Sequence, residues 1–404
     1  MKRILFVDDE APALEGLRSR LHRLSGKWEM AFVGSAEQAI EAMQRQPYDV
    51  IVTDMRMPGG MDGGKLLEAI SARWPQTVRI MLSGYSELAP TVRLIPFVHQ
   101  YLSKPCQPQQ LENVVDRCLG LQALLSQPDL RGIVGRIRQL PSLPHIYTAL
   151  QNIVRDDSVT LSEVAELVAA DAALAARVLQ IVNSAFFRLA RRISNIEQAV
   201  NYLGFGAIRN LALTVEVFAQ WPGGGSGVLD LHKLQSHAQG VAAGAHALTV
   251  GTEIADDTLL AGLLHDIGYW VLAQECPADL HQAVELAVAS AVPLHVAESQ
   301  VIGASHAEIG AYLLGIWGLP YPVIEAVAHH HGPGHVIQSE FDVLAAVSIA
   351  HALVPNDDAS AFGAPLSAEP RVDESYLTSV KAPFDWTEAT RRVAARLNSE
   401  EPSP

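Results

Sequence analysis

The sequence predicts two folds in one chain: an α/β domain with a doubly wound, five-stranded parallel sheet, followed by an all-α helical bundle. Short apolar runs rich in Val, Ile and Leu occur in the first hundred residues. Such runs are typical of strands buried on both faces of a parallel sheet. After residue 110 the apolar residues recur at helical spacing. The chain therefore changes from α/β to α at about that point.

Polar residues follow four of the apolar runs, which are Ile4 to Val7, Val50 to Thr53, Val78 to Leu82 and Val98 to Leu102. Ligands of parallel α/β sheets gather beyond the carboxyl ends of the strands. Three carboxylates brought together there would repel one another, so a hard cation such as Mg²⁺ is the natural neutraliser. The pattern predicts phosphoryl transfer onto a carboxylate at a site built from Asp8, Asp9, Asp54, Ser83 and Lys104.

These motifs, with the string Asp54-Met55-Arg56-Met57-Pro58 and Gly63, make residues 1–121 resemble a response-regulator receiver domain. The resemblance implies that Asp54 is the phospho-acceptor and that Mg²⁺ is held by Asp8, Asp9, Asp54 and the backbone carbonyl of Arg56. It also implies a switch hydroxyl, a switch aromatic residue and a phosphoryl-contacting lysine at Ser83, Tyr101 and Lys104. A sensor histidine kinase or phosphotransfer protein is the expected upstream partner.

Length and composition bound the remaining chain. A length of 404 residues suits two or three domains. No apolar stretch approaches the roughly 20 residues needed to span a bilayer, and no signal-peptide pattern is evident. The three cysteines, Cys106, Cys118 and Cys276, show no ligand spacing and cannot all pair. We therefore expect a cytoplasmic protein without a membrane partner.

Negative charge is concentrated in the second half. Residues 1–125 contain 14 Lys plus Arg and 14 Asp plus Glu, whereas the rest contains 15 and 30, which accounts for the net charge of −15. Between Asn210 and Pro370 the only basic residue is Lys233. Duplex binding needs several cationic side chains on phosphates, so a DNA-binding output is not expected.

Helical spacing continues from Leu111 to Leu125, which predicts that the last receiver helix runs on as a connector. We expect a receiver at 1–121, a connector helix at 122–139, a helical output domain at 140–353, and a linker with a helical tail at 354–404. The output half also has a basic group at Arg177, Arg188, Arg191, Arg192 and Arg209. These residues form either a rim exposed to solvent or a contact surface, and the surface would bind an acidic partner or the receiver itself.

Several motifs of the second half resemble the HDOD domain, a helical output module related to the HD phosphohydrolases. They are Leu140 to Pro144, Asp171 to Leu179, Asn183 to Phe187, and Ala261-Gly262-Leu263-Leu264-His265-Asp266-Ile267-Gly268. The first three blocks distinguish the HDOD domain from HD phosphodiesterases, which do not ordinarily carry them. The resemblance implies an all-α bundle that acts through contacts with an unknown downstream protein. The sequence leaves open whether the protein forms a homodimer.

Twelve of the 15 histidines lie between residues 210 and 370. An adjacent His-Asp pair can offer an imidazole and a carboxylate to one metal ion or to neighbouring ions. The candidates that resemble HD-type ligands to Fe, Mn or Zn are His237, His265, Asp266, His306, His329, His330 and His351. The alternative function is therefore a metal-dependent cyclic di-GMP phosphodiesterase controlled by the receiver.

Three departures from the phosphodiesterase pattern argue against turnover. His351 stands where that pattern ends in Asp, Tyr269 stands where a Lys is usual, and the GYP signature is absent after His331. Hydrolysis of a cyclic dinucleotide needs cationic groups where charge develops, and with Lys233 alone in this stretch, metal ions would have to supply nearly all of that charge. We therefore expect a non-catalytic output; a nucleotide sensor without turnover is a third reading.

Overall fold

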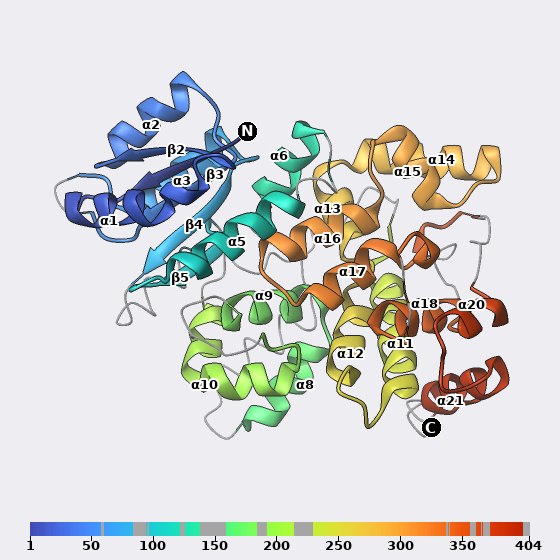
Figure 1. The fold of residues 1–404 in the computed structure, drawn as a ribbon. Helices are drawn as coiled ribbons and strands as arrows, with labels where there is room; N and C mark the ends of the chain where they lie inside the picture. The colour runs from blue at the N-terminus through green and yellow to red at the C-terminus, as the bar shows by residue number, and fades with distance from the viewer. Residues whose placement is uncertain are drawn as a thin grey trace.

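The computed structural model describes residues 1–57, 60–83, 94, 97–121, 125, 127–137, 159–183, 192–213, 229–336, 338, 340–355, 361–364, 366 and 372–398. Side chains are described for these residues except Ser83, Ser103, Pro128 and residues 205–213. Figure 1 shows the predicted division: a sheet domain at the N-terminus and a helical bundle beyond it. Within the described chain, no helix combines the length and apolarity that crossing a membrane requires.

The N-terminal sheet is parallel, with strand order β2-β1-β3-β4-β5. The strands are β1 (Lys2–Val7), β2 (Trp28–Val33), β3 (Val50–Asp54), β4 (Val78–Ser83) and β5 (Gln100–Ser103). The helices between them are α1 (Ala11–Leu21), η1 (His22–Leu24), α2 (Ala36–Arg45), α3 (Gly63–Arg73) and α5 (Pro108–Leu121). This order confirms the doubly wound sheet.

Two apolar layers cover the sheet. Side chains of β1 and β3 alternate between them, because successive residues of a strand point to opposite faces: Leu5 and Ile51 join α2 and α3, whereas Ile4 and Val50 join α1 and α5. The second layer is continuous with the core of the helical bundle. The receiver is thus packed onto the bundle through α5, a helix that covers this sheet face and contacts α16 (His306–Ile316).

The helical region begins with α6 (Pro128–Arg136), which lies between the sheet and the bundle (Figure 1). The expected continuous connector is wrong, because α5 ends at Leu121 and a separate helix starts at Pro128. Gln127 has an extended backbone (φ −82°, ψ 126°), and a proline fits the first turn of a helix but not its interior. The connector is therefore a second, docked helix.

Among the described residues after α6, all regular elements are helices, as the sequence predicted. The helices of the bundle are α8 (Leu161–Ala169), α9 (Ala172–Val182), α10 (Ile196–Leu213, broken at Gly204), α11 (Leu231–Thr249), α12 (Ala255–Leu264), α13 (Ile267–Glu275), α14 (Pro277–Ser290), α15 (Leu294–Val301), α16 (His306–Ile316), α17 (Tyr321–His329) and α18 (Val343–Leu353), with η4 (Pro333–His335). The predicted helical tail is present as α20 (Glu374–Ser379) and α21 (Trp386–Asn398), and α21 packs on α11.

Buried arginines mark the junction of the two domains. Arg79 of β4 is fully buried, and its Nη2 donates to the Gly135 carbonyl of α6 at 2.7 Å. Arg177 of α9 is 1% exposed, and its guanidinium carbon lies 4.1 Å from the ring centroid of Trp317. Gln180, which accepts a hydrogen bond from Arg177, donates to the Val98 carbonyl of the receiver at 3.4 Å. The sequence left open whether the basic residues of the output half form a solvated rim or a contact face. Arg177 belongs to the face that meets the receiver.

Arg192 is also mostly buried, and burial together with Arg117 lowers its pKa to about 9. Arg188 and Arg191 lie outside the described residues, as does the side chain of Arg209.

Candidate functional sites

The carboxylates of the receiver converge at the carboxyl edge of the sheet. Asp8 directly follows β1 and Asp54 ends β3, and these two strands are neighbours. Lys104, after β5, places its Nζ 2.8 Å from Asp54 Oδ1 and 2.9 Å from Asp8 Oδ2. One ammonium therefore bridges two of the three carboxylates.

The third carboxylate completes a set of oxygen ligands. Asp8, Asp9 and Asp54 offer oxygens that all lie within 4.8 Å of one another, and Asp9 is exposed. Gly63 packs so closely behind Asp54 that a Cβ there would overlap the Asp54 carbonyl oxygen. Oxygen ligands of this kind suit Mg²⁺, which keeps part of its water shell.

Burial and the ion pairs act against each other at this site. Burial raises the pKa of Asp54, although its contacts with Lys104 lower it in part. Burial alone would lower the pKa of Lys104, but hydrogen bonds to Asp54 and Asp8 outweigh burial and raise it. Lys104 thus stays charged while it holds both carboxylates.

The remaining receiver residues lie around this site. Arg56 follows β3 by two residues and is exposed, and Ser83 ends β4, with its side chain outside the described atoms. Tyr101 of β5 is 4% exposed, and burial raises its pKa well above the ordinary value. The nearby charge of Arg177, which belongs to α9 of the helical domain, opposes this rise in pKa.

The helical bundle gathers histidines from separate helices around Asp266. His265 and Asp266 join α12 to α13, His306 is the first residue of α16, and His330 directly follows α17. Asp266 lies 3.1 Å from His265 Nε2, 3.4 Å from His306 Nε2 and 3.8 Å from His330 Nε2. These residues are between 0 and 3% exposed.

Backbone carbonyls fix the tautomer of two of these rings. His265 Nδ1 lies 2.7 Å from the Gly262 carbonyl, and His330 Nδ1 lies 2.8 Å from the Val327 carbonyl. A carbonyl can only accept, so each Nδ1 carries the proton and each Nε2 presents its lone pair to the cluster. This is the arrangement that second-layer groups impose on metal-binding imidazoles.

A buried carboxylate holds His306. Glu298 of α15 is fully buried, and its Oε2 accepts from both the backbone N–H and Nδ1 of His306 at 2.7 Å. Burial acts to lower the pKa of His306, but the charges of Glu298 and Asp266 raise it to about 10. His306 Nε2 also lies 2.8 Å from His331 Nε2, and Tyr269 stacks on His306 with ring centroids 3.9 Å apart.

The structure brings together most of the histidines that the sequence suggested. His237 of α11 and His351 of α18 lie beside His265, with ring centroids 5.3 Å and 5.2 Å from it. His329 is the exception: it ends α17, is only half-buried, and belongs to none of the groups of close ligand atoms among the described residues. His331 takes that place.

Sequence reasoning missed three neighbours of the cluster. They are Glu298, His331 and His295, which stacks on His331 with centroids 4.4 Å apart. A run of three histidines contains no periodicity that selects its members, and Glu298 belongs to no spaced motif. Only the packing of α15, α16 and α17 identifies them.

The cluster offers three overlapping sets of metal ligands among the described residues. Within each set the ligand atoms lie within 4.8 Å of one another: His237, His265 and His351; His306, His330 and His331; and His265, Asp266 and His330. Imidazole nitrogens suit Zn, Fe, Cu and Ni, and a carboxylate can join two ions. This donor set therefore fits one or two divalent transition-metal ions.

Comparison with known proteins assigns the family of each half. Residues 4–116 match the response regulator receiver domain, and residues 140–333 match the HDOD domain. The crystal structure of the MmoQ response regulator from Methylococcus capsulatus is similar over 63% of this chain and 98% of that one, with a TM-score of 0.50 and 20% identity. That similarity supports the fold alone.

Two curated relatives match parts of the chain. An uncharacterized protein of Treponema pallidum is 31% identical over 227 residues, which are 54% of this chain and 43% of that protein. The hydrogenase transcriptional regulatory protein HoxA of Cupriavidus necator is 34% identical over 123 residues, 30% of this chain and 25% of HoxA. The chain thus spans less than half the length of these relatives.

The fold, the acidic site and both family matches agree. The protein is a response regulator, and it combines an N-terminal receiver domain with a C-terminal HDOD domain. A receiver domain implies a kinase or phosphotransfer partner and generally uses Mg²⁺.

Proposed function

We propose that phosphorylation of Asp54 controls an HDOD domain that acts by binding another protein. One observation supports the acceptor role above all: Lys104 contacts both Asp54 and Asp8 at the edge where β1 and β3 end. Mg²⁺ would be held by Asp8, Asp9, Asp54 and the Arg56 carbonyl, where it would neutralise the carboxylates during transfer.

The charge of the product provides the driving force for a switch. Phosphorylation adds about −1.5 to −2 charge, which draws Lys104 towards the phosphoryl group. In our proposal the Ser83 hydroxyl joins it and Tyr101 follows. Tyr101 packs in the layer of α2 and α3, but it lies near enough to Arg177 of α9 for that charge to act on it, so its displacement would change how the two domains dock.

Incubation of the purified protein with acetyl phosphate and Mg²⁺ tests the acceptor. The wild type should gain one acid-labile phosphoryl group by intact mass, and Asp54→Asn should gain none. Asp116→Asn, which alters a surface carboxylate paired with Lys27, is the matched control and should be modified normally. Equal modification of Asp54→Asn would overturn the assignment, and chelation of Mg²⁺ should prevent labelling.

The second part of the proposal is that the HDOD domain binds rather than cleaves. The histidine cluster contains acidic and imidazole groups, and the single basic residue between 210 and 370, Lys233, lies exposed in the first turn of α11. Between residues 210 and 370, a developing phosphate charge therefore has no arginine and no lysine other than Lys233 to stabilise it, and the proton of His306 is already shared with Glu298 and Asp266. The downstream partner we propose is a protein, not DNA.

The histidine cluster supports a second candidate function, a metal site of Zn, Fe or Mn. His237, His265, His351, His306, His330 and His331 would supply nitrogens, and Asp266 would lie between them. A bound ion would act as a Lewis acid and lower the pKa of bound water. If the HDOD domain is a phosphodiesterase, the protein should cleave cyclic di-GMP in the presence of Mn²⁺ or Fe²⁺. Asp266→Ala should then abolish this cleavage.

We expect metal without such turnover. Elemental analysis of the purified protein should find a transition metal that His265→Ala loses, while His281→Ala, a surface histidine beside Glu285, keeps it. Rapid hydrolysis by the wild type that disappears in His265→Ala would replace the binding proposal with the enzymatic one. Absence of metal from both the wild type and the control would reject the metal site.

A further inference from the structure

Helix α16 is tied to a different domain at each of its ends. At its C-terminal end the last four carbonyls need partners from outside the helical pattern. Three of them are met locally, by the N–H groups of Trp317, Gly318 and Leu319. The fourth, the Ile316 carbonyl, accepts from Gln100 Nε2 at 2.7 Å. Gln100 is the first residue of β5, so the receiver completes the C-terminal cap of an HDOD helix.

The N-terminal end of α16 lies in the histidine cluster. Ser305 and Glu308 form a capping box, and the first helical residue is His306. Its backbone N–H and its ring both donate to Glu298. Any displacement of α16 along its axis therefore moves His306 against Glu298, Asp266 and His331.

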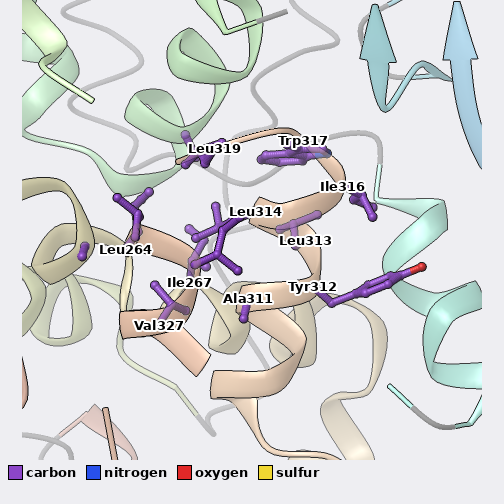
Figure 2. Close-up of a cluster of buried hydrophobic side chains, with 14 of the residues drawn as sticks. Leu264, Ile267, Ala311, Tyr312, Leu313, Leu314, Ile316, Trp317, Leu319 and Val327 are labelled. Atoms are coloured by element: carbon purple, nitrogen blue, oxygen red, sulfur yellow. The ribbon is translucent and has the colours of Figure 1, made fainter. Parts of the chain in front are cut away.

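Close packing leaves α16 little lateral freedom. A Cβ at Gly315 would overlap the Leu121 side chain of α5, and one at Gly268 would overlap the His306 carbonyl oxygen. Figure 2 shows Leu314 beside Leu264 and Ile267 in the bundle core, while Tyr312 points the other way, toward the teal segment of the receiver side. The helix thus packs on the receiver helix α5 on one side and on α13 of its own domain on the other.

We propose that α16 couples the phosphorylation site to the histidine cluster, so that the state of Asp54 changes the metal affinity of the cluster. The contacts are continuous. Asp54 contacts Lys104, Lys104 directly follows β5, Gln100 of β5 caps α16, and α16 begins with His306. The inference rests on the proposed metal site and adds its regulation.

The geometry makes α16 a suitable transmitter. A helix of 11 residues spans about 16 Å, and it moves as a unit because a packed interior resists continuous deformation. Withdrawal of Lys104 towards a phosphoryl group pulls on the strand that supplies Gln100. Coupling is reciprocal, so an ion on the cluster must alter the phosphorylation equilibrium of Asp54 by the same factor.

Cobalt(II) titration of the whole protein measures the coupling. Four-coordinate Co²⁺ absorbs visible light much more strongly than octahedral Co²⁺, so a four-coordinate imidazole site in the cluster gives a signal that an octahedral, oxygen-ligated receiver site does not. Titrations are run in excess Mg²⁺ with and without beryllofluoride, a stable mimic of the aspartyl phosphate. We expect the Kd for Co²⁺ to change about fivefold or more in the wild type.

Two variants define the route. Gln100→Ala removes the cap on Ile316 and should reduce the beryllofluoride effect to less than about twofold, whereas basal Co²⁺ binding persists. Gln109→Ala changes an exposed glutamine of α5 that contacts Asn113 and should behave as the wild type. An unchanged Kd in the wild type, or an undiminished effect in Gln100→Ala, would overturn the coupling.

Failure of the metal site itself gives a different result. If neither form binds Co²⁺, the metal proposal is wrong, and hydrogen exchange decides the coupling. Amides of residues 307–310 should then change their exchange when beryllofluoride binds to the wild type, but not in Gln100→Ala. Unchanged exchange there would reject α16 as the transmitter.

Discussion

The receiver site and the histidine cluster both gather ligands for divalent ions, but they balance charge differently. In the receiver, three carboxylates face one ammonium, and Asp9 is open to solvent. In the cluster, Asp266 and Glu298 are buried among imidazoles that can take up protons themselves. The first site therefore needs an external cation, whereas the second can exchange a proton on His306 for a metal ion.

The largest effect should follow from removing the charge of Glu298. Glu298→Gln keeps the size of the side chain but removes the nearer of the two anionic partners of the buried His306, so we expect a loss of about 3–5 kcal/mol in the free energy of unfolding. Metal affinity should fall about 10–100-fold, because the group that orients a ligand is lost. Denaturant unfolding and Co²⁺ titration measure the two quantities.

An exposed pair provides the control for this variant. Glu285 lies 3.4 Å from His281, and both side chains are more than half exposed. Glu285→Gln should cost no more than about 1 kcal/mol. A similar small effect of Glu298→Gln would show that the cluster does not depend on its buried carboxylate, and the contrast between the two sites would fail.

Two glycines allow each site to be broken separately. Gly63 packs against the Asp54 carbonyl and Gly268 against the His306 carbonyl, and neither position has room for a Cβ. Each change to Ala should cost about 1–3 kcal/mol of stability through overpacking. Gly63→Ala should slow labelling by acetyl phosphate and spare Co²⁺ binding, while Gly268→Ala should do the reverse.

Gly16 of α1 is the control, because a Cβ at this position would have no neighbouring atom within 4 Å. Gly16→Ala should leave both sites unchanged and stabilise the helix by up to about 1 kcal/mol. If Gly63→Ala and Gly268→Ala each impaired both sites equally, the two sites would have to be treated as one cooperative unit.

The receiver could be predicted from the sequence because its site is set by local chain geometry. Asp8, Asp54 and Lys104 each follow an apolar run, and parallel strands place their carboxyl ends at one edge. The convergence of these residues needs no knowledge of distant packing, whereas the strand order β2-β1-β3-β4-β5 comes from the structure. The helical character of the bundle was predictable for a similar reason, since helices such as Ala172–Val182 follow from apolar periodicity.

The parts that sequence could not supply depend on contacts between distant segments. His331 replaces His329 because of how α17 ends against α16, which a run of identical residues does not reveal. An arginine such as Arg177 is usually exposed to solvent, yet Arg177 stacks on Trp317 at the domain junction. Gln100 has no motif at all, and only the position of Ile316 shows its role.

A smaller, pH-dependent effect should arise at the junction between the two regions. His99 precedes β5 and is 7% exposed, with its ring 2.7 Å from an Arg79 guanidinium nitrogen. Burial, followed by the charges of Arg79 and Arg177, lowers the pKa of His99 well below 6.5. The folded protein thus keeps His99 neutral at pH values where the unfolded chain would protonate it.

The sign follows from this depressed pKa. Above about pH 6.5, His99 is neutral in both the folded and the unfolded state, so its packing contributes fully to stability. Below about pH 6.5, the unfolded chain binds a proton on His99, whereas the folded protein does not. The contribution should fall by about 1.4 kcal/mol for each pH unit until the folded pKa is reached. Urea unfolding of the wild type and His99→Gln at about pH 7.5, 6.5 and 5.5 isolates it. Their difference in unfolding free energy should be nearly constant between the first two values and shift against the wild type at the third; a constant difference throughout would mean that His99 is protonated, or solvated, within the junction.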